Sequence, residues 1–287
     1  MTHQDDDDVF AQARPMLLGL AYRLLGSRAD AEDAVQDTWL KWRASASDAI
    51  DNPGAWLTTL CTRRCIDLLR SAHKSRVDYV GTWLPEPWQT SGDGEDVSLA
   101  SSLTTAFLLV LERLTPKERA AYLLHEVFDV SYAETARTLE IHETACRKLV
   151  SRAREHVDQA KVRHVTPRDR QEELLAAFEA AIVGGHTERL AALLSHDVEL
   201  RADGGGKVAA AREALHGKDL VLAFVDRILR QFWHDIEWDA SDLNGARGVI
   251  LRQRGQAIAT VSFAFDEHGA ATGIYIMRNP DKLVGLA

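Results

Sequence analysis

Apolar residues recur at helical spacing through most of the first 160 residues of the chain. Residues 10–25 and 56–74 each carry one apolar stripe, which is typical of a helix packed on a core. Between them, Ser27 is placed to cap a helix that continues to about residue 44. A further helical module covers residues 103–157 and includes a helix start at Thr115-Pro116. The pattern therefore predicts two successive all-α modules.

Residues 132–154 predict two short helices around a tight turn. The second helix has a narrow apolar face formed by Cys146, Leu149, Val150 and Ala153. Its other face carries donors of hydrogen bonds: Thr144, Arg147, Lys148, Ser151, Arg152 and Arg154. A helix-turn-helix needs this arrangement to place its second helix in the major groove of DNA. The alternative is an ordinary helical hairpin with a solvated basic face.

Two other helices carry one-sided charge. The helix after Ser27 turns polar side chains outward, namely Asp30, Asp33, Gln36 and Asp37, as either a solvated face or a docking surface for a basic partner. The helix over residues 56–74 has a basic flank that includes Arg63, Arg64, Arg70 and Lys74. Trp39, Trp42 and Trp56 lie near this flank in the sequence. Aromatic and basic groups together can hold an unpaired DNA strand, although each tryptophan is expected to be a core residue.

Residues 77–102 break the helical periodicity. They contain Trp83-Leu84-Pro85-Glu86-Pro87-Trp88, followed by a run rich in Ser, Gly and Asp. Two prolines and two tryptophans in six residues make a stiff segment with exposed apolar groups. We expect this linker to dock on another part of the protein.

After residue 165 the pattern changes from helical to mixed. Helical spacing covers residues 171–183, 187–194 and 220–232, and a strand is expected at 198–202. Four further strands are expected at 236–243, 248–253, 257–265 and 272–277, of which the last three form an antiparallel meander. Helices followed by a curved sheet predict an α+β cone. The glycine run 204–206 is interpreted as a tight turn that places Asp203 and Lys207 against another segment, rather than as a phosphate site.

Charge and cysteine content limit the functional classes. The net charge is −9, with acid concentrated before residue 51 and base at 63–76 and 147–163. Such a chain is expected to bind duplex DNA weakly until a partner masks the acid. Three cysteines rule out a disulfide framework, and Cys61 and Cys65 are expected to be buried thiols rather than metal ligands. No apolar run approaches about 18 residues and no secretion signal is visible, so we expect a cytoplasmic protein without membrane contact.

Three blocks resemble extracytoplasmic-function (ECF) RNA polymerase sigma factors: RADAEDAVQDTWLKW from Arg28, WLTTLCTRRCIDLLR from Trp56, and residues 114–154. The resemblance implies that the acidic helix docks on the β′ clamp of core RNA polymerase, with the β flap as a second contact. It also implies that residues 56–76 melt and read the minus-ten element, and that residues 143–154 read the minus-thirty-five element. Arg63 stands where the family often has Asn, so the minus-ten preference is not carried over.

The C-terminal part resembles SnoaL-like, NTF2-like domains. The motifs WLPEP (Trp83 to Pro87), DGGGK (Asp203 to Lys207) and NPDKL (Asn279 to Leu283) are similar to those of the ECF subgroup with such an extension, often called ECF41. The predicted organisation is sigma region 2 at 1–76, a linker at 77–102, sigma region 4 at 103–163 and the cone at 168–287. We expect a regulatory contact between linker and cone, formed by Trp83, Leu84, Pro85, Asp203, Lys207, Asn279, Asp281 and Lys282.

These observations predict a promoter-specificity subunit of bacterial RNA polymerase that is modulated by its own C-terminal domain. The expected partners are core polymerase and promoter DNA, with an anti-sigma protein or a small ligand at the C-terminal domain as further candidates. We expect no enzyme activity, no cofactor and no metal. The alternatives are a C-terminal pocket that binds or converts a small molecule, with Asp203, His234 or Asp235 as acid or base, and a free-standing DNA-binding repressor.

Overall fold

The computed structural model describes residues 3–45, 50–77, 79–90, 102–160, 162 and 166–286, which fold into two compact units. Unit 1 comprises Met1–Val77 and Val110–Gln159, and unit 2 comprises Asp78–Leu109 and Ala160–Ala287. The predicted linker therefore packs with the C-terminal part of the chain. Its described residues, 79–90, are considered below as part of unit 2.

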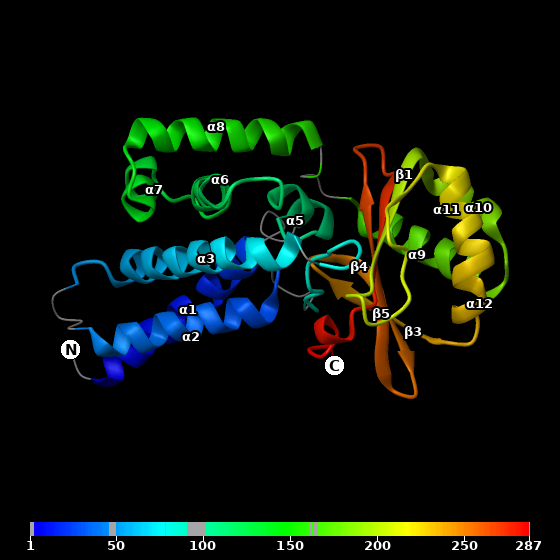
Figure 1. Ribbon diagram of the computed structural model, residues 1–287, viewed down its shortest axis with the longest axis horizontal. Helices are drawn as coiled ribbons and strands as arrows, with labels where there is room; N and C mark the ends of the chain where they lie inside the picture. The colour runs from blue at the N-terminus through cyan, green and yellow to red at the C-terminus, as the bar shows by residue number, and fades with distance from the viewer. Residues whose placement is uncertain are drawn as a thin grey trace. The chain divides into compact units, whose positions relative to one another are not determined.

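Unit 1 is helical, as the spacing of its apolar residues predicts (Figure 1). Its elements are α1 (His3–Leu25), α2 (Arg28–Ala44), α3 (Pro53–Val77), α6 (Pro116–Tyr122), the π-helix η2 (Leu123–Val127), α7 (Tyr132–Leu139) and α8 (Glu143–Ala160). Helices α1, α2 and α3 pack against one another, and α3 also contacts α6 and α7. The two helical modules of the sequence thus form one body in this structure.

The helix starts in unit 1 follow local side-chain chemistry. Ser27 caps α2 by accepting from the Asp30 amide at 3.2 Å, as predicted. Thr115 and Glu118 form a capping box at the start of α6. Helix α3 begins at Pro53, three residues before the predicted position, because the Asn52 side chain accepts from the Ala55 amide at 3.0 Å. Pro53 and Gly54 therefore belong to the first turn of the helix.

Unit 2 is built on a six-stranded sheet of order β2-β1-β6-β5-β4-β3. The strands are β1 (Leu194–Asp203), β2 (Leu215–His216), β3 (Glu237–Leu243), β4 (Ala246–Gln253), β5 (Gln256–Phe265) and β6 (Ala271–Met277). The helices are α5 (Thr105–Leu111), whose last residues belong to unit 1, α9 (Arg168–Val183), α10 (Thr187–Leu193), α11 (Lys218–Phe224), the π-helix η3 (Val225–Leu229), α12 (Arg230–Trp233) and the short 3-10 helix η4 (Pro280–Lys282). Strands β4, β5 and β6 form the antiparallel meander that the sequence predicts, and β3 extends it by pairing antiparallel with β4.

Unit 2 also has features that the sequence pattern does not predict. Strand β1 pairs with β6 in parallel and begins at Leu194, so the predicted helix ends one residue earlier. Strand β2 and helix η4 were not predicted. The parallel pairing of β1 with β6 joins segments about 75 residues apart, which a local pattern does not show. Strand β2 and helix η4 are only two and three residues long, so they leave no periodic signal.

Both faces of the sheet are covered. Helices α9 to α12 pack on one face around Phe178 and Trp233, with Ile274 and Ile276 of β6 pointing to them. The alternate residues Tyr275 and Met277 point to the other face, where they pack with Leu84 of the linker, Ala106 of α5 and Leu283. A linker segment thus completes the second core of the α+β cone. This explains why β6 is buried almost throughout instead of alternating with solvent.

Candidate functional site

The outward face of α2 presents the predicted acidic surface. The residues Ala31, Ala34, Val35, Thr38 and Trp42 are buried, as the spacing predicts. Asp30, Asp33 and Gln36 are exposed on the opposite side. Leu40 lies on the same outward face, one to two turns along, and is 57% exposed. The acidic surface thus also carries an exposed apolar side chain, which helical spacing alone would place there.

The Asp37 carboxylate, predicted to face outward, is paired with another side chain of the same chain. It accepts from Arg64 Nε of α3 at 2.6 Å, and both side chains are a little over a third exposed. A residue expected to contact polymerase and one expected to contact DNA are therefore paired with each other. Asp33 is the cleaner probe of the acidic surface because Asp37 also holds α2 to α3.

Two other basic residues of α3, Arg63 and Arg70, are also engaged within the chain. Arg63 donates through Nε to the carbonyl of Thr138 at 2.9 Å and through Nη2 to that of Arg137 at 3.1 Å, and its Nη1 lies 3.0 Å from Glu140 Oε1. The guanidinium thus caps the C-terminal end of α7. Arg70 pairs with Asp67 at 3.3 Å. Lys74 lies in the last turns of α3, and its side chain is outside the described residues.

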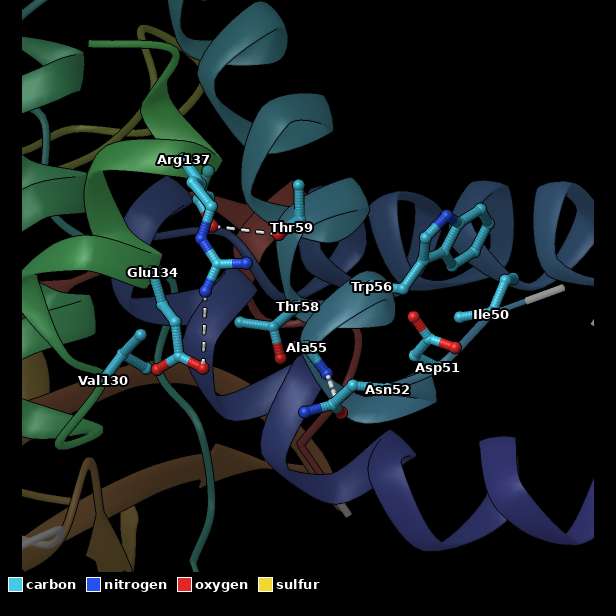
Figure 2. A pocket seen from close by; sticks show the side chains of 11 residues that line it. Ile50, Asp51, Asn52, Ala55, Trp56, Thr58, Thr59, Val130, Glu134 and Arg137 are labelled. Carbon is cyan, nitrogen blue, oxygen red and sulfur yellow. Dashed lines mark hydrogen bonds and ion pairs between the residues drawn. The ribbon is translucent and has the colours of Figure 1, made fainter. Parts of the chain in front are cut away.

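A cleft of about 630 Å³ opens between the first turns of α3 and helix α7 (Figure 2). Its lining is mixed, with Trp56 beside the polar side chains of Asn52, Thr58, Thr59, Glu134 and Arg137. The hydroxyl oxygens of Thr59 and Thr138 lie 2.9 Å apart and join the two helices. Of the three tryptophans, Trp42 is a core residue at 1% exposure, whereas Trp39 and Trp56 are half-buried. Trp56 is therefore the aromatic side chain available in this cleft.

Helix α8 has the two faces predicted for a recognition helix. Cys146, Val150, Ala153 and Val157 are buried, while all six predicted DNA-contacting residues are exposed: Thr144, Arg147, Lys148, Ser151, Arg152 and Arg154. The tight turn before α8 is made by Glu140 in the left-handed region at φ 53°. Three of the arginines have carboxylate partners: Arg147 pairs with Glu143, Arg152 with Glu118 and Arg154 with Glu126. All three arginines are thus paired within the chain and remain exposed.

The predicted contact between linker and cone is centred on Asp203, whose side chain is fully buried at the end of β1. Its Oδ1 accepts from Tyr79 Oη at 2.6 Å and from the Gly205 amide at 2.9 Å. Its Oδ2 accepts from the Leu84 amide at 2.9 Å and from Lys282 Nζ at 2.8 Å. We call these five residues the Asp203 network. It supplies the hydrogen bonds and the opposite charge that a buried carboxylate requires.

Lys282 extends the Asp203 network along the linker. Its Nζ also donates to the Leu84 carbonyl at 2.6 Å and lies 4.5 Å from the Trp83 ring centroid and 5.0 Å from that of Tyr79. Leu84 is 1% exposed and Pro85 is buried. Burial and then the neighbouring Asp203 carboxylate raise the pKa of the Tyr79 phenol well above its ordinary value. Tyr79 is thus held neutral as a donor, a role that the sequence analysis did not assign.

The glycine turn and the NPDKL segment meet at the same place. Gly205 has a φ of +61°, and a Cβ there would lie 2.4 Å from the Asn279 side chain, so only glycine fits. Asn279 Nδ2 donates to Tyr79 Oη at 2.9 Å. Lys207 and Asp281 form an ion pair on the surface, with more than half of each side chain exposed. The structure therefore brings together all eight residues of the expected contact, three in the linker and five in the cone.

The linker continues along the edge of the sheet. The Asn244 amide donates to the Trp88 carbonyl at 2.8 Å, and the Thr90 amide donates to the Asp242 carbonyl at 2.9 Å. These bonds extend the edge strand β3 by a short antiparallel bridge at Gln89. On the other side of the undescribed segment, Thr105 and Ser262 hydroxyls lie 3.0 Å apart in a buried position. Both ends of the connection between the helical modules are thus anchored on the sheet.

Comparison with known proteins identifies the family. Residues 9–75 match the family model of Sigma-70 region 2, and residues 104–157 match that of Sigma-70, region 4. The chain is 36% identical to the ECF RNA polymerase sigma factor SigJ of Mycobacterium tuberculosis, over 96% of this chain and 92% of the relative. The chain belongs to the ECF RNA polymerase sigma factors. It binds core RNA polymerase and promoter DNA as a transcription initiation factor.

One further relative and one solved structure also cover nearly the whole sigma factor. A probable ECF RNA polymerase sigma factor, SigI of Mycobacterium tuberculosis, is 27% identical over 94% of this chain and 92% of its own length. The crystal structure of SigJ from the same organism matches with a TM-score of 0.77 and 34% identity, covering 96% of this chain and 97% of that one. The likeness therefore includes the C-terminal domain as well as the two sigma regions.

The acids and bases named for the enzyme alternative lie in different environments of the sigma factor. Asp203 is committed to the network with Lys282 and Tyr79, and His234 and Asp235 are exposed at the end of α12. Among the described residues, no group of three or more His, Cys, Asp or Glu side chains is placed to hold a metal ion. The described thiols of Cys61, Cys65 and Cys146 are free and buried, as expected, and burial raises the pKa of Cys65. In the part of the chain that the structure describes, no helix has the length and apolar character to cross a membrane.

Proposed function

We propose that the sigma factor docks on the β′ clamp of core polymerase through the outward face of α2. The observation that supports this most directly is the surface itself: Asp33 and Gln36 are exposed, and Leu40 provides an apolar group 57% exposed beside them. Carboxylates steer a basic partner, and covering the exposed leucine side chain would add affinity by removing apolar surface from water. The β flap remains a candidate contact of region 4. An anti-sigma protein remains a candidate partner of the C-terminal domain.

We further propose that α8 reads the minus-thirty-five element and that the start of α3 captures the minus-ten strand. The exposed donors of α8 reach base edges and phosphates. The cleft beside Trp56 has the size and the mixed aromatic and polar lining that suits an unpaired base. In the compact form of unit 1, Glu134 and Arg137 of α7 form one wall of that cleft.

Promoter binding requires unit 1 to open. The two promoter elements are centred about 25 base pairs apart, which is roughly 85 Å of B-DNA at about 3.4 Å per base pair. A compact body of roughly 130 residues is only about 35 Å across. The Arg63 cap on α7 and the Thr59–Thr138 contact must therefore break before α3 and α8 reach both elements. We propose that the compact form of unit 1 is the inactive one.

We propose that the C-terminal domain regulates this step by holding the linker. The linker connects the two DNA-reading modules, and the Asp203 network fixes its first part on the cone. A fixed linker limits the positions that the modules can take with respect to each other. Docking of the linker thus favours or blocks open-complex formation. A ligand or a protein partner of the C-terminal domain controls whether the linker is docked.

Binding to purified core polymerase tests the proposed docking, and promoter-dependent transcription with the same proteins gives its functional consequence. We expect Asp33→Arg to weaken polymerase binding at least about tenfold, since reversing a charge in a complementary contact costs more than about 1.4 kcal/mol. Glu179→Arg makes the same charge change on an exposed position of α9 and should bind as the wild type does. Equal binding of polymerase by the wild type and Asp33→Arg would exclude this face of α2 as the docking surface.

A further inference from the structure

Tyr132, in the first turn of α7, connects the two helices of the helix-turn-helix. The Arg147 guanidinium lies over the Tyr132 ring, 4.2 Å from its centroid. The His125 imidazole packs on the same tyrosine with ring centroids 3.7 Å apart and an interplanar angle of 30°. His125 is itself fixed, because its Nδ1 lies 2.9 Å from the Val130 carbonyl oxygen. The ring is therefore a supported platform for the guanidinium.

Arg147 has a second anchor within its own helix. Its Nη2 lies 2.6 Å from Glu143 Oε1, and its Nε donates to the same oxygen at 3.2 Å. The side chain nevertheless remains 57% exposed. The Tyr132 ring and the Glu143 carboxylate thus restrain the guanidinium while leaving part of it open to solvent. Arg154, two turns further along α8, also interacts with Tyr132 and with Glu126.

We propose that Tyr132 is a positioning residue for base readout, which acts through Arg147 and does not itself select the base. An arginine loses side-chain entropy when it forms a directed pair with a base, and an arginine already held in place loses less. Held over the ring, the guanidinium favours the base that fits its position over bases that require it to move. The proposal rests on the assignment of α8 to the minus-thirty-five element.

The alternative is that Tyr132 only packs the fold of region 4. In that case its loss would weaken binding to every sequence alike and would leave base preference unchanged. A positioning role predicts a change in preference at the position that Arg147 reads, with the other positions unaffected. These two outcomes are separable in the full-length protein assembled with core polymerase.

The test compares Tyr132→Phe, Tyr132→Met, Arg147→Ala and the double variant Tyr132→Met/Arg147→Ala in a binding-site selection over the minus-thirty-five element. Methionine fills much of the volume and adapts to irregular packing, and phenylalanine keeps the ring. We expect Arg147→Ala to relax preference at one or two base positions. Tyr132→Met should relax the same positions about threefold to tenfold, Tyr132→Phe should retain them, and the double variant should match Arg147→Ala.

The failures of the two assignments are distinguishable. If Arg147→Ala keeps the wild-type preference, the proposed role of α8 is wrong. If Arg147→Ala loses preference and Tyr132→Met keeps it, Tyr132 is not a positioning residue. A measurement on the wild type covers the case in which Tyr132→Met does not fold. NMR relaxation of the arginine Nε nitrogens should show that the Arg147 side chain is more ordered than that of Arg137, which is 77% exposed. Equal mobility of the two side chains would overturn the inference.

Discussion

Replacing Asp203 with alanine should release the linker from the cone. The substitution removes the acceptor of four hydrogen bonds, from Tyr79, Leu84, Gly205 and Lys282, and leaves the Lys282 ammonium 15% exposed without its carboxylate. Removing one partner of a buried ion pair costs roughly 3–5 kcal/mol. That energy corresponds to an increase of about a hundredfold to several thousandfold in the equilibrium constant for undocking of the linker.

The matched control is Asp281→Ala, in the other ion pair of the same region. Asp281 Oδ2 lies 2.5 Å from Lys207 Nζ, but the two side chains are 62% and 54% exposed. An exposed pair of this kind is worth about 0–1 kcal/mol. Both residues belong to the expected regulatory contact, yet the structure assigns them very different energies. We expect Asp281→Ala to keep the linker docked.

Native-state hydrogen exchange measures the effect at two linker amides: Leu84, which donates to Asp203 itself, and Thr90, whose acceptor, the Asp242 carbonyl, is untouched by the substitution. Protection should be lost in Asp203→Ala and kept in Asp281→Ala, and promoter-dependent transcription should change only in the former. Unchanged protection and unchanged transcription in Asp203→Ala would refute the argument from the buried network. Equal losses in both variants would show that the linker is not held mainly through Asp203.

Two further predictions concern pH and the compact form of unit 1. Since the pKa of Tyr79 is raised from 10.0 by burial and by Asp203, its neutral form stabilises the docked linker below about pH 10, and this stabilisation is lost at higher pH. The difference in thermal stability between the wild type and Tyr79→Phe should therefore be present at pH 8 and shrink above pH 10; a constant difference would contradict the assignment. The Thr59 and Thr138 hydroxyl oxygens are 2.9 Å apart, so a Thr59→Cys/Thr138→Cys disulfide should lock unit 1 and abolish promoter-dependent transcription until a reductant is added. Full activity of the oxidised double variant, with Thr59→Cys alone as control, would show that unit 1 need not open.

The sequence was sufficient for elements and faces that depend on local spacing. The buried set of α2 and the exposed set of α8 follow from a period of 3.6 residues, and the structure confirms both. The prediction that the linker docks also rested on a local argument, that Leu84 in a proline-bounded segment lacks a core of its own. Its 1% exposure and its contacts with the sheet confirm the docking.

Contacts between distant segments could not be read in the same way. Arg63 and Arg64 were assigned to DNA because they form a basic flank, but Arg64 pairs with Asp37 and Arg63 caps a helix about 75 residues away. A charge pattern shows that partners are needed and does not show which ones. The roles of these residues in polymerase and DNA binding stay predictions. Tyr79 was missed for a related reason, because only the fold places its hydroxyl against Asp203.

The two sets of intramolecular contacts differ in how readily they open. Arg63 is 43% exposed where it caps α7, so a DNA phosphate can replace the carbonyls of Thr138 and Arg137 without first exposing a buried charge. Asp203 is fully buried, and its release leaves a carboxylate, an ammonium and a phenol without their present partners. If Arg63 contacts DNA as proposed, we expect promoter DNA to compete directly with α7 for it. We expect undocking of the linker, in contrast, to require a ligand or partner that binds the cone. We therefore expect opening of unit 1 and release of the linker to be separable steps, with a signal received by the C-terminal domain acting on the second.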